Sequence, residues 1–122
     1  MDFLHIYTDG ACSGNPGAGG YGAVLIWRSV RKEISGGFRL TTNNRMEMMA
    51  AIKSLEAIKK NIPVKLYTDS QYLFNGITKG WAKKWRRNGW MRNKKEPAQN
   101  PDLWEKILEL DTQLQIEWIW VR

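Results

Sequence analysis

The sequence contains one cysteine, one histidine and no long hydrophobic run. A single cysteine excludes an internal disulfide and a zinc site built from several cysteines. No apolar stretch approaches the roughly 18 residues of a membrane span, and no secretory signal opens the chain. These absences favour an intracellular, cytoplasmic protein without a membrane partner. The 122 residues are enough for one hydrophobic core, so we expect a single domain over 1–122.

Acidic residues are absent from one segment, and that segment accounts for the charge of the whole chain. Residues 79–95, KGWAKKWRRNGWMRNKK, contain eight Lys or Arg side chains and no Asp or Glu, a charge of +8. The rest of the chain holds eleven basic and twelve acidic residues, a charge of −1. The formal net charge of +7 therefore originates in this basic segment.

Three of the seven tryptophans, Trp81, Trp85 and Trp90, interleave with these charges. Cations suit phosphates and flat rings suit sugars or bases, so the basic segment predicts contact with nucleic acid. A helix would place Trp81 and Trp85 on one face, where they could instead anchor that helix to the core. Two other interpretations are a solvated basic face and a membrane-surface helix, although Gly80 and Gly89 interrupt an amphipathic face.

The periodicity of apolar residues predicts a mixed α/β fold. Strands are expected at 3–9, 21–28, 33–40, 64–69 and 115–121, and helices at 41–60, 70–78 and 100–114. The first three strands are joined by short links, which favours an antiparallel meander. Asn43 or Asn44 could cap the first helix, and Asn100 followed by Pro101 is typical of a helix start. We therefore expect a mixed five-stranded sheet flanked by helices.

Six of the eleven glycines fall within residues 8–22, TDGACSGNPGAGGYG. This stretch is not a P-loop, because no Lys-Ser or Lys-Thr pair follows its spaced glycines. Its GAGGYG text matches a dinucleotide-binding pattern, but a predicted strand follows it where that pattern needs a helix. We expect the glycines to provide positive φ angles and close backbone approach in a strand-to-strand turn.

Asp9 and Asp69 each end an apolar strand, and Glu47 lies in the first turns of the helix between them. Each acid has an ordinary explanation: Asp9-Gly10 as a turn, Asn44 with Glu47 as a capping box, and Asp69 as a helix cap. If the fold gathers them, carboxylates about 4 Å apart repel by roughly 4 kcal/mol per pair at an effective dielectric constant of about 20.

Such a carboxylate cluster persists only by protonation or by binding cations. Oxygen ligands without His or Cys companions suit Mg²⁺ or Mn²⁺ rather than zinc. A metal-carboxylate site beside a basic, tryptophan-bearing surface indicates phosphodiester chemistry on nucleic acid.

The motifs TDGACSGNPGAGGYGA, TTNNRMEMMAA and TDSQYLFNGI, followed by the basic segment and IEWIWV, closely resemble ribonuclease H of the bacterial type 1 class, ribonuclease HI. The resemblance runs from the first strand to the last residue. It implies a ribonuclease H-like mixed sheet with three antiparallel strands followed by parallel ones. It also implies a monomer that cleaves the RNA strand of RNA–DNA hybrids endonucleolytically, leaving 3′-hydroxyl and 5′-phosphate ends.

By the same resemblance, Asp9, Glu47 and Asp69 are the catalytic, metal-binding carboxylates. Two Mg²⁺ ions, or Mn²⁺ as a substitute, would activate water and stabilise the leaving oxygen in an in-line displacement. The residues that match positions lining the minor groove of the hybrid, where the 2′-hydroxyl distinguishes RNA from DNA, are Cys12, Asn15, Asn43, Asn44 and Gln71.

The resemblance also assigns contacts to the DNA strand. Thr42 matches a position that helps to hold a DNA-strand phosphate. The basic segment matches the substrate-binding protrusion of the family, with Trp81 and Trp85 against the DNA strand. The cations expected beside them are Lys83, Lys84, Arg86 and Arg87.

Some of these residues have simpler interpretations. Cys12 could be a small buried hydrophobic residue, and Gln71 could form a capping box with Thr68. We interpret His5 as structural. Three methionines are expected in the core rather than as ligands: Met46, Met48 and Met49.

Family members continue beyond the matched part into a Gly-His loop and a last helix, which supply a mobile histidine and a fourth metal-binding aspartate. Neither is present in these 122 residues. The resemblance therefore implies a C-terminally incomplete domain with apolar surface uncovered and with slow or Mn²⁺-dependent cleavage. One alternative is a hybrid- or duplex-binding module with a crippled active site. Another is the ribonuclease H part of a reverse transcriptase, which the methionine start and compact chain disfavour.

Overall fold

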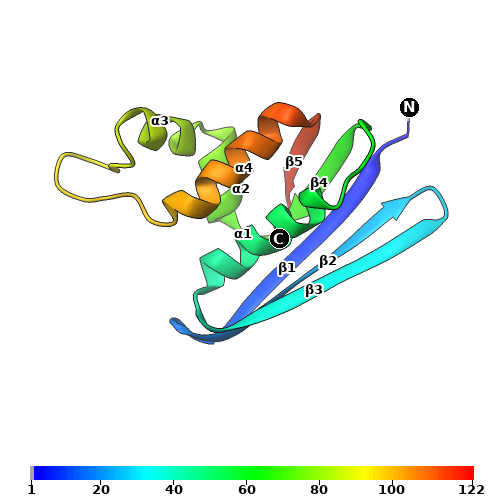
Figure 1. Cartoon of the computed structure of the whole chain (residues 1–122), viewed down its shortest axis with the longest axis horizontal. Coiled ribbons are helices and arrows are strands. Elements are labelled where there is room, and N and C mark those ends of the chain that lie inside the picture. Colours follow the sequence, from blue (N-terminus) through cyan, green and yellow to red (C-terminus); the bar gives the residue numbers. More distant parts are fainter. Residues whose placement is uncertain (1) are drawn as a thin grey trace.

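The computed structural model describes residues 2–122, and these residues form a five-stranded mixed sheet with helices packed against it (Figure 1). The strands are β1 (Leu4–Gly14), β2 (Gly17–Trp27), β3 (Val30–Thr41), β4 (Val64–Thr68) and β5 (Ile116–Trp120). Their order in the sheet is β3-β2-β1-β4-β5. β1, β2 and β3 pair antiparallel, whereas β4 pairs parallel with both β1 and β5. The predicted fold class and the predicted meander are confirmed.

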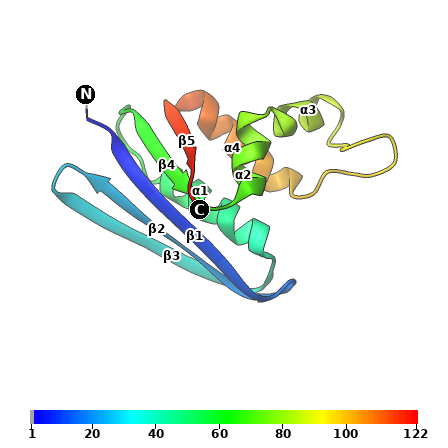
Figure 2. The same ribbon diagram turned by 180° about the vertical axis from the view of Figure 1, so that it is seen from behind.

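Helices cover one face of this sheet. They are α1 (Asn43–Glu56), α2 (Gln71–Thr78), α3 (Trp81–Arg87) and α4 (Pro101–Gln113). α1 packs across β1 and β2, and α4 packs on α1, so the helices lie to one side of the sheet in both views (Figures 1 and 2). Within the described residues, no helix has the length and apolar character needed to cross a membrane.

The hydrophobic core lies between α1, α4 and the covered face of the sheet. Ile6 and Leu66 from neighbouring strands are fully buried there, together with Met48 of α1 and Trp104 of α4. Met46 is also buried, as the sequence predicted for the methionines. On the opposite face of β1, Tyr7 is 46% exposed and stacks on Tyr67 of β4 with ring centroids 4.6 Å apart.

The glycine-rich stretch is mostly strand rather than loop. β1 continues to Gly14 and β2 begins at Gly17, so the turn between them is shorter than predicted. Asp9 therefore lies within a strand, and its explanation as a turn residue is wrong. In this stretch only Gly14 has a positive φ, of 90°. Gly10 is needed for close approach, because a Cβ there would lie 2.5 Å from the backbone of α1.

Two helix caps differ from the prediction. Thr42, rather than Asn43 or Asn44, caps α1 by accepting a backbone N–H three residues on, at 3.2 Å. Ser70, rather than Asp69, caps α2 in the same way at 3.1 Å. A side-chain hydroxyl therefore accepts a free backbone N–H in the first turn of each helix. The capping explanations for the nearby acids are wrong.

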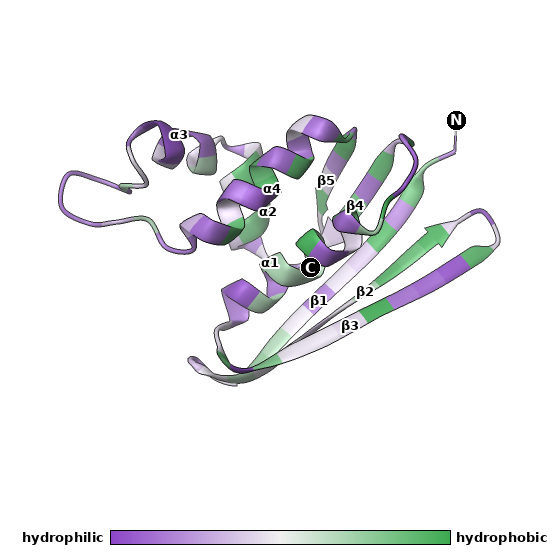
Figure 3. Ribbon diagram, viewed as in Figure 1, coloured by the Kyte–Doolittle hydropathy of each residue, from purple (hydrophilic) through white to green (hydrophobic). Residues whose placement is uncertain are grey.

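The basic segment 79–95 contains a helix of its own. α3 begins at Trp81 and ends at Arg87, and an irregular loop then leads to the start of α4. Figure 3 shows that α3 and this loop are mostly hydrophilic, with paler stretches between the hydrophilic ones. Asn100 and Pro101 begin α4 as predicted, although the Asn100 side chain does not cap it.

Candidate active site

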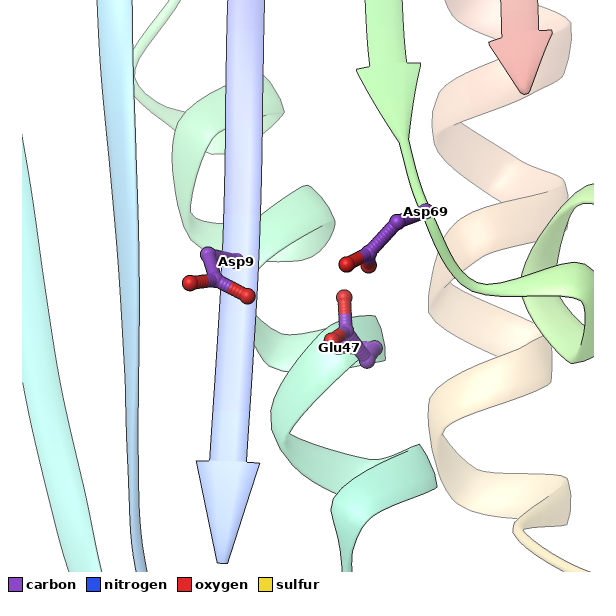
Figure 4. Close-up of side chains that lie close together, drawn as sticks. All are labelled: Asp9, Glu47 and Asp69. Carbon is purple, nitrogen blue, oxygen red and sulfur yellow. The ribbon is translucent and has the colours of Figure 1, made fainter. Parts of the chain in front are cut away.

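Three acidic side chains from separate elements converge beside β1, the central strand of the sheet (Figure 4). One carboxylate oxygen from each of Asp9, Glu47 and Asp69 lies within 4.8 Å of the other two. Asp9 is on β1, and Asp69 directly follows β4, the strand that pairs parallel with β1. The parallel register pairs Tyr7 with Tyr67, so Asp9 and Asp69, each two residues further along, lie side by side. Glu47 reaches them from α1.

The surroundings of Glu47 disfavour the ionised form of its carboxyl group. The residue is 8% exposed, and Oε1 accepts a hydrogen bond from the backbone N–H of Gly10 at 3.2 Å. Burial, followed by the negative charges of Asp69 and Asp9, raises the pKa of Glu47 from its ordinary value of 4.5 to about 8. Without a cation, this carboxyl group therefore carries a proton at neutral pH.

The donor set fits a hard divalent cation. Oε2 of Glu47 is the one buried side-chain oxygen or nitrogen in residues 2–122 that has no hydrogen-bond partner. Asp9 and Asp69 are exposed, so their oxygens are open to solvent and to a ligand. No histidine or cysteine of the described residues joins the cluster. Oxygen ligands with open positions suit Mg²⁺ or Mn²⁺.

Most of the side chains predicted to meet a minor groove surround these acids. A shallow hollow is lined by the backbone near Gly10 and by Cys12, Asn43, Asn44, Glu47, Asp69, Gln71 and Tyr72. Asn15 is outside this lining, on the turn between β1 and β2, but its Oδ1 accepts the backbone N–H of Asn43 at 3.1 Å. The structure thus brings four of the five predicted minor-groove side chains, Cys12, Asn43, Asn44 and Gln71, to the hollow that Glu47 and Asp69 line.

Two simpler interpretations of this region are wrong. Cys12 is not a buried hydrophobic residue, because it is partly exposed and its Sγ lies 3.3 Å from the carbonyl oxygens of Gly17 and Thr41. Gln71 does not form a capping box with Thr68, because Ser70 is the cap of α2. The Gln71 side chain is exposed beside the acids.

The basic segment presents its charges to solvent. The cations Lys83, Lys84, Arg86 and Arg87 are all exposed. Trp81 and Trp85 share a face of α3, with ring centroids 6.4 Å apart. Trp81 is 39% exposed. Trp85 packs edge-on against Trp104, with ring centroids 6.2 Å apart. Trp85 is therefore partly a core anchor, and Trp81 is the more available of the two rings.

A second hollow lies beside α3. It is lined by Tyr72, Trp81, Trp85, Arg92, Glu96 and residues 97–99. Tyr72 lines both this hollow and the acidic one. Sequence reasoning missed Tyr72, because its hydroxyl partners are 27 to 32 residues away along the chain and no local pattern signals them.

The mixed sheet and the carboxylate cluster formed by β1, α1 and the residue after β4 define a ribonuclease H-like protein. The model of the RNase H family matches residues 2–122. The chain belongs to the ribonuclease H family and is an enzyme of the hydrolase class, a nuclease.

Known relatives support this assignment. The ribonuclease H of Rippkaea orientalis (strain PCC 8801 / RF-1) is 68% identical over 117 residues, which cover 96% of this chain and 72% of that protein. LC9-RNase H1, described as a type 1 RNase H with the type 2 active-site motif, superposes with a TM-score of 0.86 at 29% identity. That match covers all of this chain and 64% of the other.

LC11-RNase H1, solved in complex with an RNA/DNA hybrid, shares the fold with a TM-score of 0.72 at 23% identity. The match covers 97% of this chain and 84% of that one. The resemblance to ribonuclease H stated from the motifs is confirmed.

Proposed function

We propose that this chain hydrolyses the RNA strand of RNA–DNA hybrids at the cluster of Asp9, Glu47 and Asp69, with two divalent metal ions. The observation that carries the proposal is the unpartnered, buried Oε2 of Glu47 within a three-carboxylate cluster of 4.8 Å. Membership of the ribonuclease H family supports the reaction, and the hybrid complex of LC11-RNase H1 supports the substrate. Mg²⁺ is the proposed ion, with Mn²⁺ as a substitute.

When bound, the ions would activate a water molecule and stabilise the leaving oxygen, leaving a 3′-hydroxyl and a 5′-phosphate. The chain's own groups prepare this site. The N–H of Gly10 donates to Asp9 Oδ1 at 2.9 Å as well as to Glu47, so one backbone group orients two acids. Asp69 completes the set from the end of β4. Glu47 must lose its proton for the full ligand set to form.

We propose that the hybrid lies across the acidic hollow and extends toward the basic segment. The minor-groove contacts are assigned to Cys12, Asn15, Asn43, Asn44 and Gln71, where amides and a thiol can meet 2′-hydroxyls. Thr42 would hold a DNA-strand phosphate. α3 and its loop would serve as the substrate-binding protrusion, with Trp81 and Trp85 against the DNA strand. We further propose that the chain acts as a monomer in the cytoplasm.

The direct test is cleavage of an end-labelled RNA–DNA hybrid by this chain in Mg²⁺ or Mn²⁺. Asp9→Asn is the matched control, because it removes one metal-binding charge at an exposed position. We expect the unaltered chain to cut RNA and the variant to bind the hybrid without cutting. If both bind and neither cuts, this chain is a hybrid-binding module. If neither binds, the substrate assignment is wrong.

A further inference from the structure

Arg45 makes the most extensive side-chain contacts near the acids, and the proposed chemistry does not use it. It lies two residues before Glu47 on α1 and reaches across to the start of α4. Its guanidinium binds the Asp102 carboxylate through two parallel bonds of 2.8 and 3.1 Å, and donates a third, of 3.2 Å, to Asn100 Oδ1. A planar fork matches a carboxylate in this way, and a lysine cannot reproduce it.

Asn100 connects the Arg45–Asp102 ion pair to α2 through hydrogen bonds. Its Nδ2 donates to the Tyr72 hydroxyl at 3.3 Å, and Trp104 Nε1 donates to the same oxygen at 2.9 Å. The hydroxyl in turn donates to the carbonyl of Gln99 at 3.3 Å. Asn100 has a φ of 59°, a left-handed conformation that asparagine tolerates better than most residues. We call Arg45, Tyr72, Asn100 and Asp102 the Arg45 network.

The Arg45 network connects the parts of the chain on both sides of the basic segment. Tyr72 lies on α2, before residue 79, and Asn100 and Asp102 lie at the start of α4, after residue 95. The other end of the network is on α1, beside Asn43, Asn44 and Glu47 of the acidic hollow. Tyr72 itself lines both hollows. The network therefore spans the space between the carboxylates and the tryptophans.

We propose that Arg45 is a positioning residue that fixes the basic segment relative to the carboxylate cluster, so that one hybrid can engage both. The inference rests on the proposed hybrid substrate and adds to it a determinant of affinity for long hybrids. The side chains of Arg45 and Asp102 are 34% and 62% exposed. A partly exposed ion pair contributes little to global stability. Loss of this pair should therefore change the position of one hollow relative to the other without unfolding the chain.

The test compares a long hybrid that covers both hollows with a short hybrid that covers the carboxylates alone. For Arg45→Gln we expect KM to rise roughly tenfold on the long hybrid, with KM on the short hybrid and kcat on both unchanged, which is the signature of lost binding rather than lost chemistry. Arg45→Lys should behave like Arg45→Gln, because the charge stays but the fork is lost. Arg28→Gln is the matched control, because Arg28 forms an exposed pair with Asp2 at 2.9 Å away from this network.

Asp102→Asn separates positioning from direct contact with the substrate. If Arg45 itself bound a phosphate, removing its partner would free the guanidinium and lower KM. Positioning instead requires Asp102→Asn to raise KM on the long hybrid as Arg45→Gln does. Equal losses on both hybrids, a lower KM for Asp102→Asn, or no change in any variant would overturn the inference. If the unaltered chain neither binds nor cuts a hybrid, it is the proposed function that fails.

Discussion

Glu47 is the residue whose proton couples the site to pH. Its folded pKa of about 8 exceeds the ordinary 4.5, so the metal-free folded state holds this proton more tightly than the unfolded chain. The resulting stability is fully present below pH 4.5 and is lost as pH rises through about 8. We expect metal-free Glu47→Gln to unfold at a temperature close to that of the unaltered chain near pH 5 and at a higher one near pH 9.

Thermal unfolding in EDTA across this pH range measures the effect. Glu109→Gln is the control, because Glu109 is exposed on α4, away from the carboxylate cluster. It should change the unfolding temperature equally at all pH values. A constant difference for Glu47→Gln as well would show that Glu47 keeps an ordinary pKa in the folded chain.

Asp69 is expected to matter for chemistry more than for binding. Asp69→Asn keeps the shape of the side chain but removes one negative ligand, so we expect divalent-dependent cleavage to fall by at least about 100-fold. Hybrid affinity should change little, because the proposed binding mode assigns most of the attraction to phosphates to the basic segment. Single-turnover cleavage and filter binding measure the two properties separately. Cleavage by the variant at the unaltered rate would remove Asp69 from the metal site.

At the residue scale, the sequence predicted those features that depend on residues close together along the chain. The apolar stretches that lead to Asp9 and Asp69 are visible in the sequence and indicate both acids, although β1 continues beyond Asp9 to Gly14. Which residue caps each helix was decided by backbone geometry that the pattern does not contain, so Thr42 was missed as a cap. Arg45 was missed altogether, because its partners lie 55 and 57 residues away.

The secondary-structure elements were predicted better in type than in extent. The strand expected at 21–28 begins at Gly17, because pairing with β1 extends it through glycines that carry no strand signal of their own. Within the basic segment, a shared face of Trp81 and Trp85 was predicted only for the case of a helix, and the helix α3 itself was not predicted. Tertiary pairing and packing, rather than local propensity, set these limits.

We expect the cations of α3 to contribute to the salt dependence of hybrid binding. Lys83 and Lys84 are exposed on this helix, so replacing both with alanine should remove one or two phosphate contacts. The slope of log affinity against log salt should then become shallower by roughly 1 to 2. Lys59→Ala with Lys60→Ala is the matched control, because these lysines are adjacent, exposed and located between α1 and β4. Equal slopes for the two double variants would favour a merely solvated basic face.

For the whole molecule, the order of elements predicted the architecture, because a strand that follows α1 can pair parallel with β1 through a helical crossover. That crossover is what joins the carboxylates: β1 supplies Asp9, the helix supplies Glu47 and the returning strand leads to Asp69. Three segments far apart in the sequence must fold together before the cluster exists. A cation held by all three therefore binds the folded chain much better than the unfolded one.

Binding of Mg²⁺ or Mn²⁺ should consequently stabilise the whole fold. Ligand linkage gives about 2.7 kcal/mol of stabilisation when the free ion is at a hundredfold excess over its Kd. We expect the unfolding temperature to rise with ion concentration, and to rise more at pH 8.5 than at pH 6.5, because the ion must displace the Glu47 proton. Calorimetry with Asp69→Asn as the control measures this linkage. The same rise in the variant, or a rise independent of pH, would place the bound ion outside the carboxylate cluster.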